Sequence, residues 1–245
     1  LLTTERGGKL WSNIKPDTEV GKIMYDQTEY FVCIHKFDQL TSCDIVIDYS
    51  MPNVFHVKEG GKNDDFSQKH IYVAPSFMKT KIENRERTIQ SLTTFTMGRD
   101  HIRNGNLEPR RKVLLETIRK SNLDHINRND CFSEHRLQEL YQNTKVLINI
   151  NQSPHQDTFE EILCLPALQN VVVVISEKSP LNHLIPYNDL IIWCDYDNII
   201  EKTKEVLENY TEYFEKIFTT QNIELLYKLD DQNEKRLEDK IMTCI

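Results

Sequence analysis

Glycine is scarce in this sequence and unevenly distributed. The 245 residues include 7 glycines, and all of them lie within the first 105 positions. Phosphate-binding loops and dinucleotide-binding turns need glycine where the backbone closely approaches a phosphate. A Walker A loop, a G-x-G-x-x-G turn and a G-x-S-x-G nucleophile elbow are all absent. The usual ATPases, nicotinamide-dependent dehydrogenases and serine hydrolases are therefore excluded.

Long apolar runs and an excess of basic residues are also missing. No stretch reaches the roughly 20 apolar residues that span a bilayer, so we expect no membrane segment in this chain. The 30 Lys and Arg are outnumbered by 38 Asp and Glu, which argues against a nucleic-acid partner because such partners are bound by basic surfaces. The 6 cysteines contain no C-x-x-C pair, which indicates reduced thiols and a cytoplasmic protein.

The second half of the chain alternates apolar runs with amphipathic segments. This alternation predicts an α/β fold with a parallel sheet covered by helices. The expected strands are 92–97, 123–126, 146–150, 171–175 and 190–193. The expected helix starts are Pro109, Ser133 as an N-cap, about 158, and Asp197 as the cap of a long helix.

The first 88 residues carry a weaker pattern. Short strands are expected at 30–34, 44–48 and 71–73, and the charged stretch 79–87 indicates a linker or a solvated helix. We therefore expect two domains, a smaller one at residues 1–88 and a larger one at residues 89–245.

A first polar loop follows the expected strand 92–97 and enters the helix at Pro109. It is rich in cations, of which we select Arg99, Arg103 and Arg110 as phosphate ligands. Guanidinium groups and the free amides of a helix N-terminus both bind oxyanions. Ligands of open α/β sheets bind beyond the carboxyl ends of the strands, so we expect a diphosphate here. The alternative is a solvated basic patch.

A second polar loop joins the expected strand 146–150 to the next helix. Its hydrogen-bonding side chains lie between two strongly apolar strands, a position that suits a ribose or a sugar. The candidate binding residues are Ser153, His155, Asp157, Thr158, Glu160 and Glu161. The alternative for the acidic residues is an interaction with the helix dipole alone.

The run from 146 to 175, VLININQSPHQDTFEEILCLPALQNVVVVI, resembles the donor-binding segment of GT-B glycosyltransferases. It is most similar to the fucosyltransferase-like pattern E-N-S-x-x-x-D-Y-x-T-E-K. Ser153, Asp157 and Glu161 fall on the Ser, the Asp and the second Glu of that pattern. The Ile-, Asn- and Lys-rich composition is also similar to that of glycosyltransferases from large DNA viruses.

The resemblance implies a GT-B-like fold of two Rossmann-like domains with parallel sheets. It implies a transferase that moves a hexosyl or pentosyl group from a UDP- or GDP-linked sugar to a hydroxyl of a glycan or another acceptor. Residues 89–245 would then bind the nucleotide sugar, with Glu161 helping to hold it, and residues 1–88 would form the acceptor side. No metal or other cofactor is implied.

An inverting enzyme of this kind needs a general base from the N-terminal domain. Asp48 and His56 are the candidates because they flank the segment 49–53, which we expect to be a turn after a strand. The alternative roles are turn capping for Asp48 and an ordinary strand position for His56.

Two rival functions remain open. One is a non-catalytic module that binds a nucleotide or a carbohydrate and has lost the base. The other is a metal-dependent transferase of the GT-A type that uses the pair Asp195 and Asp197, which matches a D-x-D motif.

Overall fold

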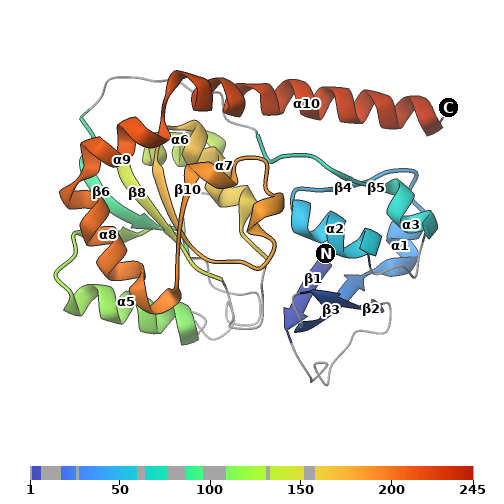
Figure 1. The fold of residues 1–245 in the computed structure, drawn as a ribbon, viewed down its shortest axis with the longest axis horizontal. Helices are drawn as coiled ribbons and strands as arrows, with labels where there is room; N and C mark the ends of the chain where they lie inside the picture. The colour runs from blue at the N-terminus through green and yellow to red at the C-terminus, as the bar shows by residue number, and fades with distance from the viewer. Residues whose placement is uncertain are drawn as a thin grey trace.

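The computed structural model describes residues 2–6, 18–25, 28–59, 64–76, 86–95, 109–130, 133–151 and 158–244. The protein has an α/β fold in which the C-terminal half surrounds a Rossmann-like sheet and the N-terminal part lies beside it (Figure 1). Among the described residues, one sheet of this kind is evident. We expected a second Rossmann-like domain in residues 1–88, but the described part of that region forms a three-stranded antiparallel sheet and a two-stranded parallel one instead.

The Rossmann-like sheet has five strands, all parallel, in the order β10-β9-β8-β6-β7. They are β6 (Ile89–Thr93), β7 (His125–Asn127), β8 (Thr144–Asn149), β9 (Val173–Glu177) and β10 (Ile191–Cys194). Strands β8 and β9 are almost completely buried, as their continuous apolar runs require in a sheet covered on both faces. The parallel sheet predicted from the sequence is confirmed.

Helices cover both faces of this sheet (Figure 1). Right-handed crossovers put α6 and α7 on one face and α5 on the other, and α8 and α9 return to pack on the strands. The bounds are α5 (Pro109–Lys120), α6 (Glu134–Gln142), α7 (Glu161–Gln169), α8 (Ile199–Glu208) and α9 (Tyr210–Ile217). As predicted, Pro109 begins α5 and the hydroxyl of Ser133 caps α6.

Several boundaries differ from the sequence prediction: β6 begins and ends earlier than the expected strand 92–97, and α7 begins at Glu161 rather than at about 158. Two further differences have a clear local cause. Asp197 does not cap a long helix, because it lies inside a 3-10 turn, η3 (Tyr196–Asn198), and α8 begins at Ile199. Strand β9 begins two residues later than expected because Val171 has a left-handed φ of 51°. Its N–H bonds to the Leu168 carbonyl while the N–H of Val172 bonds to Ala167, which closes the end of α7.

The segment between β9 and β10 contains two further 3-10 turns, η1 (Asn182–Leu184) and η2 (Asn188–Leu190).

Arg87 anchors the chain just before β6. Its guanidinium donates to the carbonyl oxygens of Tyr141, Thr144 and Asn170 at 3.0, 2.6 and 2.9 Å. Arg87 therefore already belongs to the sheet domain, next to the boundary expected near residue 88.

The N-terminal part contains two small sheets. Strands β1 (Leu2–Arg6), β2 (Thr18–Tyr25) and β3 (Thr28–His35) pair antiparallel in the order β1-β3-β2, and α1 (Phe37–Thr41) follows them. Strands β4 (Val46–Asp48) and β5 (His70–Tyr72) pair in parallel, and α2 (Met51–Glu59) and α3 (Asp64–Lys69) connect them. The expected turn at 49–53 instead enters α2, which places His56 on a helix.

The last helix, α10 (Thr220–Cys244), runs from the sheet domain across to the N-terminal part (Figure 1). The buried side-chain amide of Asn233 holds it there: its Oδ1 accepts from the N–H of Ala74 and its Nδ2 donates to the Ala74 carbonyl, at 2.9 and 2.8 Å. Ala74 and Tyr72 also belong to the same apolar core as the sheet. The region after β5 is therefore packed against the C-terminal domain.

Candidate functional site

The carboxyl edge of the Rossmann-like sheet is the first place to look for a ligand. Numbered along the domain, the strands have the doubly wound order 2-1-3-4-5, and β6 and β8 are neighbours at its switch point. The connections after these two strands lead to α5 and α7, on opposite faces of the sheet. Ligands of such folds bind in the crevice that this divergence creates.

Arg110, in the first turn of α5, lies at this edge. Its guanidinium makes a bidentate ion pair with Glu177 at the end of β9, donates to the Asn151 carbonyl at 3.2 Å and stacks 4.0 Å from the ring centroid of Tyr196. Glu177 also accepts from the Asn151 N–H at 3.0 Å. The Asn151 Oδ1 is buried and has no hydrogen-bond partner among the described residues. This cluster joins α5 to β8 and β9.

Arg111, the next residue, is buried at the same edge. Its guanidinium pairs with Glu160 just before α7 and stacks 4.8 Å from the ring centroid of Phe95. Only 4% of Arg111 is exposed, so Glu160 supplies the charge that makes its burial tolerable. This pair fixes the start of α7 relative to α5.

The predicted binding residues divide into two groups. Arg99, Arg103, Ser153, His155 and Asp157 lie outside the described residues. Of the others, Arg110, Thr158, Glu160 and Glu161 all lie beside the carboxyl edge or at the start of α7. Arg110 and Arg111 at the start of α5 already have carboxylate partners. One of these partners, Glu177, was not among the predicted binding residues, although its position at the end of an apolar strand was a signal for it.

Glu161 is completely buried between the two parts of the chain. Its Oε1 accepts from the N–H of Met51 at 2.9 Å, and its Oε2 accepts from the hydroxyls of Tyr72 and Tyr187, both at 2.8 Å. Burial raises the pKa of this carboxyl to about 7, and the hydrogen bonds oppose that rise. Both oxygens are thus occupied by donors from α2, from β5 and from the segment after η1.

Asp48, at the end of β4, is held by three neighbours. Its carboxylate accepts from the N–H of Ser50 at 2.9 Å and from the Asn53 amide at 3.4 Å, and it lies 3.2 Å from Nε2 of His70. The Asp48 side chain is 14% exposed. It borders a cavity of about 190 Å³ that is also lined by Leu40, Val46, Ile47, Tyr49, Asn53, Phe66 and His70.

His70 was missed by the sequence analysis. It is buried beneath Asp48, and its Nδ1 has no hydrogen-bond partner among the described residues. When Nε2–H donates to Asp48, the imidazole orients the carboxylate toward the cavity. Parallel pairing of the strands expected at 44–48 and 71–73 was the signal that could have placed His70 beside Asp48.

His56 occupies a different environment from Asp48. It lies on α2 with 4% of its surface exposed, and burial lowers its pKa to about 4. Its ring makes an edge contact with Phe55 at a centroid distance of 6.1 Å. His56 is not among the residues that line the cavity bordered by Asp48, so access to an acceptor favours Asp48 over His56 as a base.

The Asp48 cluster and the carboxyl edge meet at the start of α7. Glu160 faces Arg111 at the edge, whereas Glu161 faces the N-terminal part. Burial raises the pKa of the Tyr49 hydroxyl, and so do the charges of Asp48, Glu160 and Glu161. The Tyr49 hydroxyl therefore lies within electrostatic reach of all three carboxylates.

Among the described residues, no group of three or more His, Cys, Asp or Glu side chains is placed to hold a metal ion. Asp195 of the D-x-D motif pairs with Lys178 at 3.3 Å on the surface. The described helices include none with the length and apolarity to cross a membrane. Cys43, Cys164 and Cys194 are free thiols, as expected.

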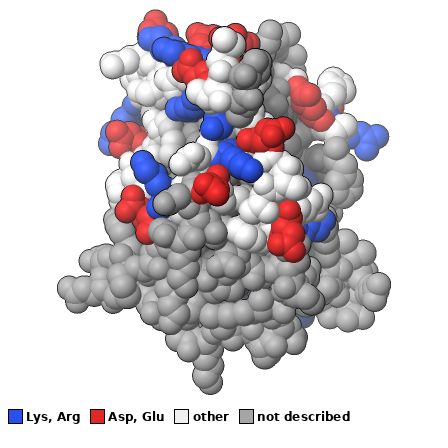
Figure 2. Space-filling model, turned by 90° about the vertical axis from the view of Figure 1, so that its right-hand side faces the viewer, with Lys and Arg blue, Asp and Glu red and all other residues white. Residues whose placement is uncertain are grey.

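Charged side chains alternate in sign on the face shown in Figure 2, so the described part of that face carries no continuous basic patch. The mixture of signs on the described part of this face accords with a sequence in which both acidic and basic residues are numerous.

Comparison with known proteins finds two distant homologues, both from Acanthamoeba polyphaga mimivirus. Uncharacterized protein R358 is 29% identical over 178 residues, which is 71% of this chain and 56% of that protein. Uncharacterized protein L140 is 24% identical over 179 residues, 71% of this chain and 55% of that protein. The chain thus spans about half the length of these relatives. No family model matches the sequence.

Proposed function

We propose that this protein is a glycosyltransferase of GT-B-like organisation that moves a sugar from a nucleoside diphosphate sugar to an acceptor hydroxyl. The observation that carries the proposal is the meeting of two sites at the start of α7. The carboxyl edge of a doubly wound sheet, with Arg110 in the first turn of a helix, suits a nucleotide. We assign the acceptor side to the cavity that Asp48 borders, because that cavity lies in the N-terminal part.

The donor's diphosphate would bind near Arg110 and the first amides of α5. Its negative charge competes with Glu177 for the guanidinium fork, which matches phosphate as well as carboxylate. As the bond between the anomeric carbon and the phosphate oxygen breaks, the leaving diphosphate takes the electron pair. Arg110 then stabilises the charge that develops there.

The acceptor would react from the Asp48 side. Its hydroxyl oxygen forms the new bond to the anomeric carbon, and the hydroxyl proton passes to the Asp48 carboxylate. Ser50, Asn53 and His70 hold that carboxylate in a fixed orientation. Glu161 joins the two sides of the site rather than touching the reactants, because its oxygens already accept from Met51, Tyr72 and Tyr187.

A thermal-shift panel tests the proposal. The protein is melted with UDP, GDP, CMP or ADP, each in Mg²⁺ and in EDTA. A ligand at 100 times its dissociation constant stabilises the native state by about 2.7 kcal/mol, which corresponds to a rise in Tm of roughly 5 to 10 °C for a chain of this length. We expect such a rise with one nucleoside diphosphate, unchanged by EDTA.

The other outcomes identify the rivals. A shift that disappears in EDTA would contradict the proposal and favour the metal-dependent transferase that uses Asp195 and Asp197. A shift without sugar transfer to any acceptor would favour a non-catalytic binding module. No shift with any nucleotide would remove the nucleotide-sugar proposal.

A further inference from the structure

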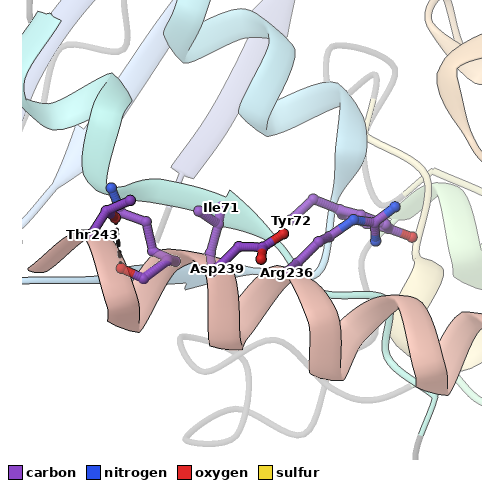
Figure 3. A pocket seen from close by; sticks show the side chains of 6 residues that line it. Ile71, Tyr72, Arg236, Asp239 and Thr243 are labelled. Atoms are coloured by element: carbon purple, nitrogen blue, oxygen red, sulfur yellow. Dashed lines mark hydrogen bonds between the residues drawn. The ribbon is translucent and has the colours of Figure 1, made fainter.

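A second cavity lies away from the site described above, between α10 and β5. It measures about 450 Å³ and is lined by Ile71, Tyr72, Arg236, Asp239, Lys240 and Thr243. Figure 3 shows the side chains of Arg236, Asp239 and Thr243 on α10 facing the residues of β5. Helix α10 crosses at this place from the sheet domain to the N-terminal part (Figure 1).

Arg236 lacks a hydrogen-bond acceptor for part of its guanidinium. Its Nη1 is buried without a partner among the described residues, and its Cζ lies 5.3 Å from the ring centroid of Tyr72. Arg87 and Arg110 by contrast donate to carbonyl or carboxylate oxygens. Arg111 also has a buried Nε without a partner among the described residues, but its Nη2 donates to Glu160. A buried donor without an acceptor is costly, so an acceptor from a ligand would be strongly favoured at this position.

The charges around Arg236 are arranged for an anion. Lys240 follows one helical turn later on the same face of α10 and forms no ion pair within the described parts of the chain. Asp239 is the acidic residue of the lining, so Arg236, Lys240 and Asp239 together give the lining a formal net charge of +1. The Thr243 hydroxyl donates to the Lys240 carbonyl at 2.7 Å. Two cations thus face a cavity with one opposing carboxylate.

We propose that this cavity binds a phosphate group on the Arg236 fork, with the Lys240 ammonium as a second cation in the lining. Guanidinium groups match the geometry of phosphate oxygens, and a neighbouring ammonium adds a point charge. The volume exceeds what a single phosphate needs, so it also accommodates a small phosphomonoester. The Asp239 carboxylate weakens the attraction and accepts from a hydroxyl of such a ligand.

Isothermal titration calorimetry tests this site with inorganic phosphate and with glycerol 3-phosphate, against sodium chloride of equal ionic strength. Arg236→Gln should weaken binding by about tenfold or more because the fork is lost. Asp239→Asn should tighten the binding of inorganic phosphate by about threefold because a like charge is removed. Lys235→Gln is the matched control: it removes the same charge from an exposed position outside the cavity lining.

Each result decides the proposal. Tighter binding of glycerol 3-phosphate than of phosphate identifies an organic phosphate as the ligand, and equal binding identifies the phosphate ion. No heat with either probe overturns the site, and so does an equal loss in Arg236→Gln and Lys235→Gln. Arg236→Lys keeps the charge without the fork and should bind with intermediate affinity if the fold is intact. Because none of these residues lies at the carboxyl edge, failure here leaves the nucleotide proposal untouched.

Discussion

Replacing Glu161 with alanine should lower the free energy of unfolding by about 3 kcal/mol at pH 5, where the folded protein keeps this carboxyl protonated. The change leaves the N–H of Met51 and the hydroxyls of Tyr72 and Tyr187 without their acceptor. A buried polar group that loses its partner costs about 1 to 3 kcal/mol. Chemical denaturation measures the effect, and Glu116→Ala, an exposed glutamate on α5, serves as the control that should change stability little.

The same carboxyl gives a stability that depends on pH in a defined direction. Its pKa is raised from 4.5 to about 7 in the folded protein. Between these values the unfolded chain has lost the proton while the folded chain keeps it, so stability falls as pH rises. The size of the fall is about 3 kcal/mol. Because Glu161→Gln removes this titration, the stability difference between wild type and variant should change across that window, and a constant difference would contradict the raised pKa.

Asp48→Asn should lower the rate of sugar transfer by about 10² to 10⁴-fold while the nucleotide still raises the Tm. A general base contributes about this much to catalysis, and asparagine keeps an oxygen for the Ser50 N–H but cannot take the acceptor's proton. Transfer is measured with the donor that the thermal-shift panel identifies. Asp44→Asn, at an exposed position just before β4, is the control.

His56 is the alternative candidate for the general base. If His56→Gln abolishes transfer while Asp48→Asn does not, the base is on α2 and the orientation argument from Ser50, Asn53 and His70 is wrong. If neither variant slows a measurable transfer, the base lies elsewhere. Loss of the nucleotide-induced Tm shift in Asp48→Asn would mean that Asp48 binds the donor instead of activating the acceptor.

The sheet domain was predictable because strongly buried strands have a simple pattern. The runs around Val146 and Val173 are apolar on both faces, as central parallel strands must be, and Pro109 and Ser133 mark helix starts chemically. Boundaries that depend on local backbone geometry were not predictable. Val171 continues the β-branched run in sequence but closes a helix in the structure.

The candidate site was predictable in its location but not in its pairings. The polar residues before α7 indicate a strand-to-helix edge, and Arg110 lies there as expected. The bond between Arg110 and Glu177 joins residues far apart in sequence, and so do the contacts of Glu161 with Met51 and Tyr72. Such partners follow from strand order and domain packing, which periodicity does not encode.

Hydrogen–deuterium exchange locates a nucleotide bound at the carboxyl edge between β6 and β8. The protein is labelled with and without the nucleoside diphosphate that gives the largest Tm shift. We expect added protection in peptides covering the first turn of α5, residues 109–113, and the end of β8, residues 149–151, because free helix amides and strand ends bind the phosphate. Protection confined to β5 and α10, with none at this edge, would contradict nucleotide binding there.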